Sequence, residues 1–231
     1  MLYVDNTFNL LDSVVEWDPN KDTWRTLNSL SVPRCWVNVC VKEGKIYVAS
    51  ESEDFIMEVL NLQENHPEWI LWPHANSGNI HAESIFTCGG QIYVYVTGYA
   101  DSVRFLWVSK QDELVEVVSI ETTPYAIVIA ADDHLVYFVD RLEPGPNIVQ
   151  CYNLETGLWT RVADLNHALG HAAAVGHNGA LYVFDRPGIY AYYLCVYDIQ
   201  KNMWTVIEEK KKLDIVSNVF LINRCDILKI D

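Results

Sequence analysis

The sequence predicts an all-β fold built from repeated four-stranded units, and three observations support this prediction. Tryptophan recurs every 45 residues, with leucine in the one other register: Trp24, Trp69, Leu114, Trp159 and Trp204. Tyrosines 44 to 46 residues apart mark a second ladder of apolar segments: Tyr47, Tyr93, Tyr137 and Tyr182. No stretch keeps a helical apolar period over about ten residues. A period of this length in β-forming residues is typical of a β-propeller or a repeat array.

The clearest repeat begins at residue 33 and contains four strand signals. An apolar-biased strand over 33–44 ends at a glycine turn, and the strand over 45–50 follows at hairpin spacing. Strands over 55–62 and 68–73 complete the unit. The same order returns three times, at 80–90, 91–96, 104–109 and 114–119, then 125–133, 134–140, 147–154 and 158–163, then 171–179, 180–185, 193–199 and 203–208.

A recurring turn joins the third and fourth strands of a repeat. Asp18, Asn153 and Asp198 each stand six residues before a tryptophan. Their side-chain oxygens can accept hydrogen bonds from backbone N–H groups of the turn. We expect each tryptophan ring to pack between adjacent sheets. In the second repeat this turn is two residues longer, and in the third, over 108–115, the motif is lost.

These segments resemble kelch repeats. The stretches 14–50 and 151–184 follow the kelch order of apolar strand, glycine turn, "IYV", strand and tryptophan, and the resemblance extends over residues 2 to about 222. It is greatest to the propellers of BTB-kelch proteins. The double glycine that usually follows "IYV" is missing, and its places hold Ser50-Glu51, Thr97-Gly98, Val139-Asp140 and Asp185-Arg186. We therefore expect these segments to adopt other conformations.

The phase of the repeats predicts a single domain over 1–231 with five blades. Residues 2–4 occupy a second-strand position, and 214–224 would supply the first strand of that blade, which removes exposed sheet edges. The alternative is a truncated six-bladed propeller, because the tail 225–231 aligns with a further second strand. The predicted repeats are 2–32, 33–72, 79–118, 124–162 and 169–207, with the closing strand 214–224.

The amino-acid composition limits which classes of partner and which cellular compartment we expect. The net charge is −15, from 31 acidic and 16 basic residues, which disfavours nucleic acid and anionic membranes and favours a basic protein or peptide. Alternatively, the acidic residues serve only to keep the protein soluble. The sequence has no long apolar run and no secretory signal, and its six cysteines lack metal-site spacing. We expect reduced thiols and a cytoplasmic or nuclear location.

Signals for catalysis or for a cofactor are missing from the sequence. It contains no G-x-S-x-G, H-E-x-x-H, phosphate-loop or dinucleotide motif. His167 and His171 are four residues apart, which suits zinc only on a helix, and they precede an extended segment. The copper-ligand set of galactose-oxidase-like proteins and the repeated boxes of sialidases are not evident. We predict no enzymatic activity, no cofactor and no metal.

The resemblance implies a partner-binding face made of the loops that enter each first strand and those that follow "IYV". Carried over by position, these loops contribute Arg34, Trp36, Glu51, His81, Tyr99, Tyr125, Arg141, His171, Arg186, Ser217 and Asn218. BTB-kelch proteins are adaptors of cullin-RING ubiquitin ligases, so the resemblance implies substrate recognition. It also implies that cullin is reached only through a BTB region, which these 231 residues do not contain. The alternative is a scaffold or actin-binding kelch protein without a link to ubiquitin.

Overall fold

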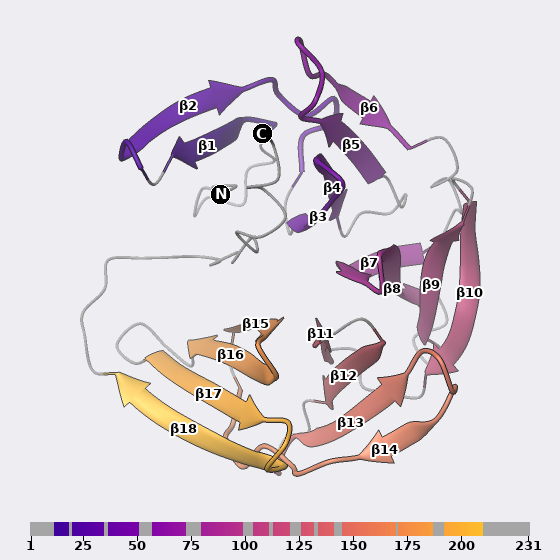
Figure 1. Cartoon of the computed structure of the whole chain (residues 1–231), viewed down its shortest axis with the longest axis vertical. Helices are drawn as coiled ribbons and strands as arrows, with labels where there is room; N and C mark the ends of the chain where they lie inside the picture. The colour runs from indigo at the N-terminus through magenta and orange to yellow at the C-terminus, as the bar shows by residue number, and fades with distance from the viewer. Residues whose placement is uncertain are drawn as a thin grey trace. The chain divides into compact units, whose positions relative to one another are not determined.

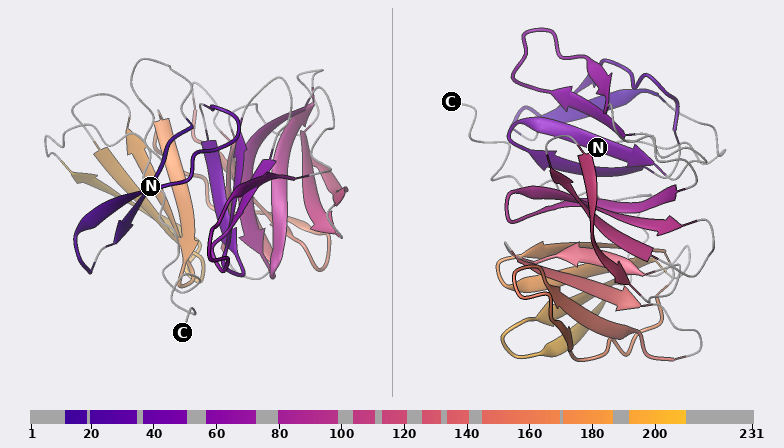
Figure 2. Two further views of the ribbon diagram at one scale, coloured as in Figure 1. Left: turned by 90° about the horizontal axis from the view of Figure 1, so that it is seen from above. Right: turned by 90° about the vertical axis from the view of Figure 1, so that its right-hand side faces the viewer.

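The computed structural model consists of β-strands joined by turns and longer connections. It describes residues 12–18, 20–34, 37–50, 57–72, 80–98, 104–110, 113–120, 126–131, 134–140, 145–169, 171–186 and 192–209. These residues form one two-stranded and four four-stranded antiparallel sheets, and no helix occurs among them. Each sheet is a separate twisted layer in Figures 1 and 2. The predicted all-β fold of four-stranded units is confirmed.

Strands within each sheet follow their order in the chain. The two-stranded sheet contains β1 (Val14–Asp18) and β2 (Thr23–Leu27). The next contains β3 (Val37–Lys42), β4 (Lys45–Ser50), β5 (Met57–Asn61) and β6 (Trp69–Leu71). It is followed by β7 (Ile80–Cys88), β8 (Gln91–Gly98), β9 (Arg104–Lys110) and β10 (Glu113–Ile120). Then come β11 (Ile127–Ala130), β12 (Leu135–Asp140), β13 (Ile148–Asn153) and β14 (Trp159–Arg161). The last has β15 (His171–His177), β16 (Ala180–Arg186), β17 (Tyr192–Asp198) and β18 (Met203–Glu209).

The chain divides into two compact units. The first comprises residues 1–87, 91–120 and 219–231, and the second comprises 88–90 and 121–218. The first three sheets therefore belong to the first unit, apart from the last residue of β7, and the sheets β11–β14 and β15–β18 belong to the second. The assignment of residues 1–231 to one domain stays a prediction.

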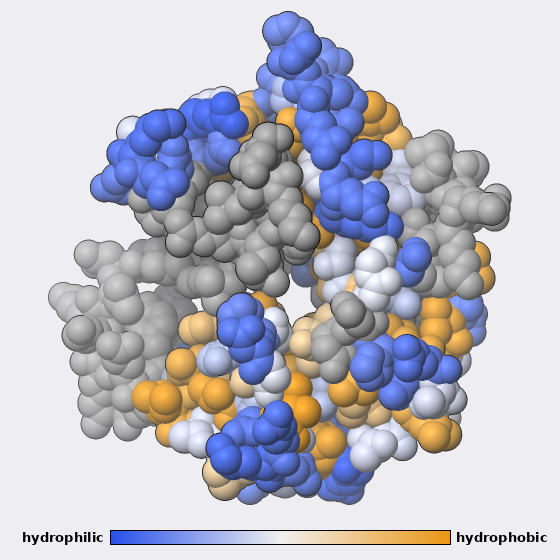
Figure 3. Space-filling view, viewed as in Figure 1, coloured by the Kyte–Doolittle hydropathy of each residue, from blue (hydrophilic) through white to orange (hydrophobic). Residues whose placement is uncertain are grey.

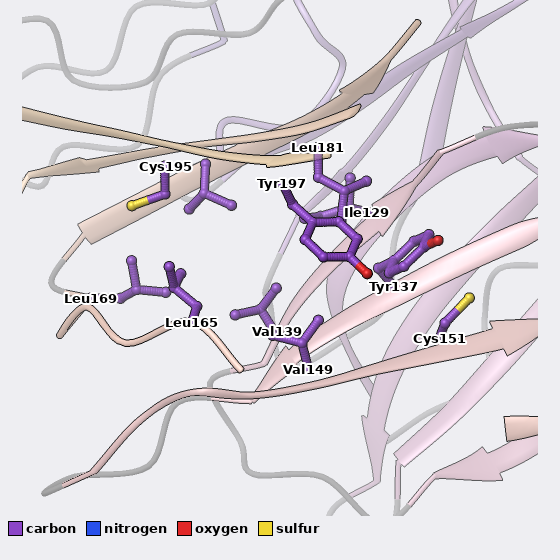
Figure 4. Packing of buried hydrophobic residues seen from close by; sticks show 11 residues of the cluster. Ile129, Tyr137, Val139, Val149, Cys151, Leu165, Leu169, Leu181, Cys195 and Tyr197 are labelled. Carbon is purple, nitrogen blue, oxygen red and sulfur yellow. The ribbon is translucent and has the colours of Figure 1, made fainter. Parts of the chain in front are cut away.

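Each unit buries its own apolar clusters between neighbouring sheets. In the first unit, one cluster joins the sheets β3–β6 and β7–β10, and another joins β1–β2 to β3–β6. In the second unit, Tyr137 of β12 faces Tyr197 of β17 with ring centroids 5.9 Å apart, and both rings are buried (Figure 4). Alternating side chains of the inner strands thus build the core, as the period-two patterning requires.

The turn chemistry follows the sequence prediction. Between β3 and β4, and between β15 and β16, two consecutive residues have positive φ, as type I′ hairpins require: Glu43 and Gly44, then Asn178 and Gly179. The Asp18 side chain accepts hydrogen bonds from the backbone N–H groups of Asn20 and Lys21, at 2.9 and 3.4 Å. Equivalent bonds to the side-chain oxygens of Asn61, Asn153 and Asp198 confirm the predicted turn. The longer β5–β6 turn is hydrophilic and projects at the top of Figure 3.

The tryptophan ladder is confirmed in part. Trp69 and Trp204 are half-buried and pack against the clusters between adjacent sheets. Trp24 and Trp159 instead remain 55% and 38% exposed. Trp24 lies in the first described sheet, which no described sheet precedes, and Trp159 contacts Phe138 and Tyr152 of its own sheet at 5.2 and 4.8 Å between ring centroids. The position in the repeat therefore does not fix the burial of the ring.

Blade number and ring closure stay predictions. The β1–β2 sheet corresponds to the third and fourth strands of a repeat, since Asp18 ends β1 and Trp24 lies in β2. The segments 2–4 and 214–224, predicted to complete that sheet, and the tail 225–231 lie outside the described residues. In the third repeat, where the turn motif is lost, only two residues separate β9 from β10, and the register shifts between Glu116 and Val118.

Candidate functional site

The described candidate binding residues lie at one end of the strands of their sheets, where first strands begin and second strands end; we call this end of a sheet its loop edge. In the β15–β18 sheet, His171 at the start of the first strand pairs with Arg186 at the end of the second, and Asp185 pairs with Tyr193 near the start of the third. The same holds in the β3–β6 sheet, where Val37 pairs with Ser50. At this edge the chain enters the first strand through a leading connection and joins the second and third strands through a 2–3 connection. Both sets of predicted loops thus leave from one edge.

The structure describes four of the eleven predicted binding residues. The backbones of His81, His171 and Arg186 lie in β7, β15 and β16, at strand ends on the loop edge, and Arg34 lies in the connection that leads into β3. The other seven lie outside the described residues: Trp36, Glu51, Tyr99, Tyr125, Arg141, Ser217 and Asn218. The assignment of these residues to partner binding stays a prediction.

The positions that lack the kelch double glycine belong to strands. Ser50 ends β4, Thr97-Gly98 ends β8, Val139-Asp140 ends β12 and Asp185-Arg186 ends β16. Non-glycine residues favour an extended backbone over the left-handed turns that glycine permits. The strands consequently continue to these positions, in agreement with the expected departure from the kelch pattern. Glu51 lies outside the described residues.

Arg34 is buried, which corrects its assignment to the partner-contacting surface. Its guanidinium donates two hydrogen bonds to Oε1 of Glu58 in β5, from Nη2 at 2.6 Å and from Nε at 3.1 Å. The two side chains are only 2% and 0% exposed. A guanidinium buried against a carboxylate in this way is not available to a partner in the described conformation.

Ser31, which is itself exposed, also bonds to Glu58. Its backbone N–H and its hydroxyl both donate to Oε2 of Glu58, at 2.8 and 2.5 Å. Glu58 therefore connects the leading connection of the β3–β6 sheet to the start of β5. Burial alone would raise the pKa of Glu58, but the hydrogen bonds from Ser31 and Arg34 outweigh it, so this pKa lies below its ordinary value.

A second polar group occupies the loop edge of the β15–β18 sheet. His167, in the connection leading into β15, lies with Nε2 3.1 Å from Oδ2 of the buried Asp185, and its ring centroid is 4.5 Å from that of Tyr193. From the preceding sheet, the Asn147 amide, in the connection between β12 and β13, donates to the carbonyl oxygens of Leu165 and His167, at 3.3 and 2.5 Å. Different residues thus attach the leading connection to the sheet in the two units.

Sequence reasoning missed most of these polar groups. Glu58 and Asp185 each interrupt an apolar strand, in "FIMEVLNL" and "ALYVFD", and a lone carboxylate in such a run signals a buried pair. The spacing of His167 and His171 suggests only a zinc pair. In the structure, the His167 ring contacts Asp185 and Tyr193 instead.

The described part of the chain places no three histidine, cysteine, aspartate or glutamate residues where they could hold a metal ion. Four cysteines are buried and in the thiol form: Cys40, Cys88, Cys151 and Cys195. Burial, with the nearby Asp185, raises the pKa of the Cys195 thiol to about 11. Thiols of this kind are poor nucleophiles and poor metal ligands at neutral pH. No described helix is long and apolar enough to span a membrane.

Comparisons with known proteins agree with this architecture. No family model matches the chain. A protein of Arabidopsis thaliana named as an F-box/kelch-repeat protein is 33% identical over 108 residues, which are 45% of this chain. The chain spans about a third of the length of that relative (33%).

Two solved structures share the fold at low identity. YjhT aligns with a TM-score of 0.60 at 10% identity, over 78% of this chain and 67% of its own. A chain of the nidogen/laminin complex aligns with a TM-score of 0.60 at 12% identity, over 84% of this chain and 71% of its own. The fold is that of a β-propeller, and the partial match to a kelch-repeat protein agrees with the kelch resemblance of the sequence.

Proposed function

We propose that this chain binds a protein or peptide partner through the connections at the loop edge. The observation that carries the proposal is the attachment of those connections. In two sheets, side chains bonded to a buried carboxylate fasten the leading connection to the strands: Ser31 and Arg34 to Glu58 in one, His167 to Asp185 in the other. Loops held on a rigid scaffold are common binding sites. The Arabidopsis relative, whose name includes kelch repeats, adds support from sequence.

The proposed contact residues are those predicted from sequence, without the buried Arg34: Trp36, Glu51, His81, Tyr99, Tyr125, Arg141, His171, Arg186, Ser217 and Asn218. Aromatic and arginine side chains dominate the binding energy of many protein interfaces. With a net charge of −15, the chain attracts a partner with basic character. We propose no enzymatic activity for it, and a location in the cytoplasm or nucleus.

We further propose that the bound partner is a substrate of a ubiquitin ligase, for which this chain serves as the recognition part. Two things support this: the resemblance to BTB-kelch adaptors, and a relative whose name joins kelch repeats to an F-box. Contact with a cullin would come from a region other than the repeats.

Proximity labelling in cells tests partner binding. The wild-type chain is compared with Y99A/R141A/R186A and with the control E64A/E155A/Q200A, whose residues are exposed in turns at the opposite edge of the sheets. The expected result is a set of proteins lost in the first variant and kept in the control. Equal sets for all three chains would refute the proposed edge. The ligase proposal then requires these proteins to become longer-lived when the chain is depleted. Co-purification of actin filaments without such an effect would favour a scaffold.

A further inference from the structure

The Arg34–Glu58 ion pair is a buried charged pair at the loop edge of the β3–β6 sheet. Moving both charges out of water is costly, and apolar residues of similar volume often replace such pairs without loss of stability. The pair therefore needs an explanation other than a general contribution to stability. The last sheet of the same chain offers an internal comparison.

The equivalent positions in the β15–β18 sheet hold an apolar residue and a thiol. Cys40 and Val175 are equivalent, because each pairs with the tyrosine of the second strand, and six residues before them stand Arg34 and Leu169. Glu58 and Cys195 are equivalent because each pairs with the residue that follows that tyrosine, Val48 or Val183. Leu169 and Cys195 are 5% and 0% exposed and pack in one cluster (Figure 4). A four-stranded sheet of this kind thus forms with an uncharged pair at these positions.

A charged group with hydrogen bonds constrains the orientation of the segment it holds, whereas an apolar contact does not. One Glu58 carboxylate receives hydrogen bonds from the Arg34 guanidinium and from the backbone and hydroxyl of Ser31. Hydrogen bonds to a charged group are directional and strong. These bonds tie Ser31 and Arg34 to β5, and Trp36 follows two residues after Arg34. On the other side, Glu58 lies two residues beyond the 2–3 connection that begins with Glu51.

We infer that Arg34, Glu58 and Ser31 act as positioning residues, which hold the leading connection of the β3–β6 sheet in the conformation that binds the partner. This inference rests on the proposed function. Arg34 then affects binding without touching the partner, which reconciles its loop position with its burial. The Arg34–Glu58 ion pair orients the leading connection, whereas Leu169 and Cys195 of the last sheet fill the apolar core.

The test transplants the pair of the last sheet into the β3–β6 sheet, as R34L/E58C. Amide hydrogen exchange is measured on peptides that contain Ser31, beside thermal unfolding and the proximity labelling described above. We expect a folded variant in which the Ser31 amide exchanges about tenfold faster or more, since it has lost a charged acceptor. The proteins that depend on Tyr99, Arg141 and Arg186 should be lost as well. The control Glu16→Gln, in the exposed pair with Arg25, should change neither readout.

Several outcomes overturn the inference. Unchanged exchange at Ser31 in the folded variant shows that the pair does not hold this segment. Faster exchange with unchanged labelling refutes the positioning role and leaves the proposed function intact. Labelling that never depends on Tyr99, Arg141 and Arg186 refutes the proposed function itself, whatever the exchange result. If R34L/E58C does not fold, Glu58→Gln replaces it, with the same two readouts and the same criteria.

Discussion

The indole N–H of Trp204 donates a 2.8 Å hydrogen bond to the carbonyl oxygen of Ala163, 41 residues earlier. Trp69 makes the same 2.8 Å bond to the carbonyl oxygen of Asn28, again 41 residues earlier. Ala163 and Asn28 both lie in the connection that leads into the sheet of their tryptophan. Trp69 and Trp204 therefore attach the outer strand of their sheet to the segment that precedes that sheet, in addition to packing against its apolar cluster.

Trp204→Phe should destabilise the chain by about 1 kcal/mol, because the carbonyl oxygen of Ala163 loses its donor while most of the ring area remains. Trp159→Phe is the matched control: Trp159 is 38% exposed and its ring packs on Phe138 and Tyr152, contacts that a phenylalanine ring can largely keep, so the free energy of unfolding should change by no more than about 0.5 kcal/mol. Urea unfolding of the three chains measures both values. Equal losses for the two variants would contradict the role given to the Trp204 bond.

Gly176→Ala should be among the most disruptive small substitutions in the second unit. A Cβ at this position would lie 2.1 Å from the carbonyl oxygen of Ala130 and 2.7 Å from Cα of Ala131, where β15 approaches β11. Backbone atoms cannot move aside easily, so we expect a loss of about 1–3 kcal/mol or more.

Gly179→Ala is the contrasting variant, since nothing lies within 4 Å of its Cβ although φ is +74°. Its cost should be limited to that of the left-handed conformation, about 1–2 kcal/mol. Thermal unfolding of both variants measures the two losses of stability, one from steric crowding at Gly176 and one from backbone strain at Gly179. A Gly176→Ala chain as stable as the wild type would show that the two strands are not this close.

Glu58 should make the stability of the chain depend on acidic pH. Its pKa in the folded chain lies below the ordinary value of 4.5. A carboxyl with a lowered folded pKa contributes stability above its unfolded pKa and loses it as the pH falls through the folded value. The difference in unfolding free energy between wild type and Glu58→Gln should therefore be constant near neutral pH and shrink below about pH 4.5. A difference that stays constant down to pH 3 would contradict this.

The four buried cysteines should resist thiol reagents in the native chain. Cys195 has a pKa raised to about 11, and burial raises the pKa of Cys40 further. Labelling of Cys40, Cys88, Cys151 and Cys195 should therefore proceed only as fast as local or global opening permits. Peptide mapping after timed labelling checks this, with the urea-unfolded chain as the fully reactive control. Native reactivity equal to that control at any of the four would refute their burial.

Features that repeat along the chain could be predicted from the sequence. The order of the strands follows from the 45-residue period, and the turn at Asp18, Asn153 and Asp198 follows from side-chain chemistry that acts within three residues. Local interactions of this kind leave a pattern that a single sequence displays. The kelch resemblance also marked the positions where the double glycine is replaced, and the structure has strand residues there.

Pairs that join distant segments could not be predicted in this way. Arg34 stands in a segment that reads as an exposed loop, and its burial depends on Glu58, 24 residues later on another strand. His167 likewise contacts Asp185, 18 residues later. Neither separation matches the repeat. The exposure of Trp24 and Trp159 is a similar case, because Trp69 and Trp204 hold the same place in the repeat and are half-buried.

The most direct test of partner binding at the loop edge is site-specific photo-crosslinking in cells. A photoreactive phenylalanine derivative replaces Tyr99, in the 2–3 connection between β8 and β9, and in a second chain it replaces Glu155, in the turn between β13 and β14 at the opposite edge. The account predicts a discrete crosslinked protein from position 99 and none from position 155. Crosslinks from position 155 alone would contradict it and would place the binding surface at the opposite edge.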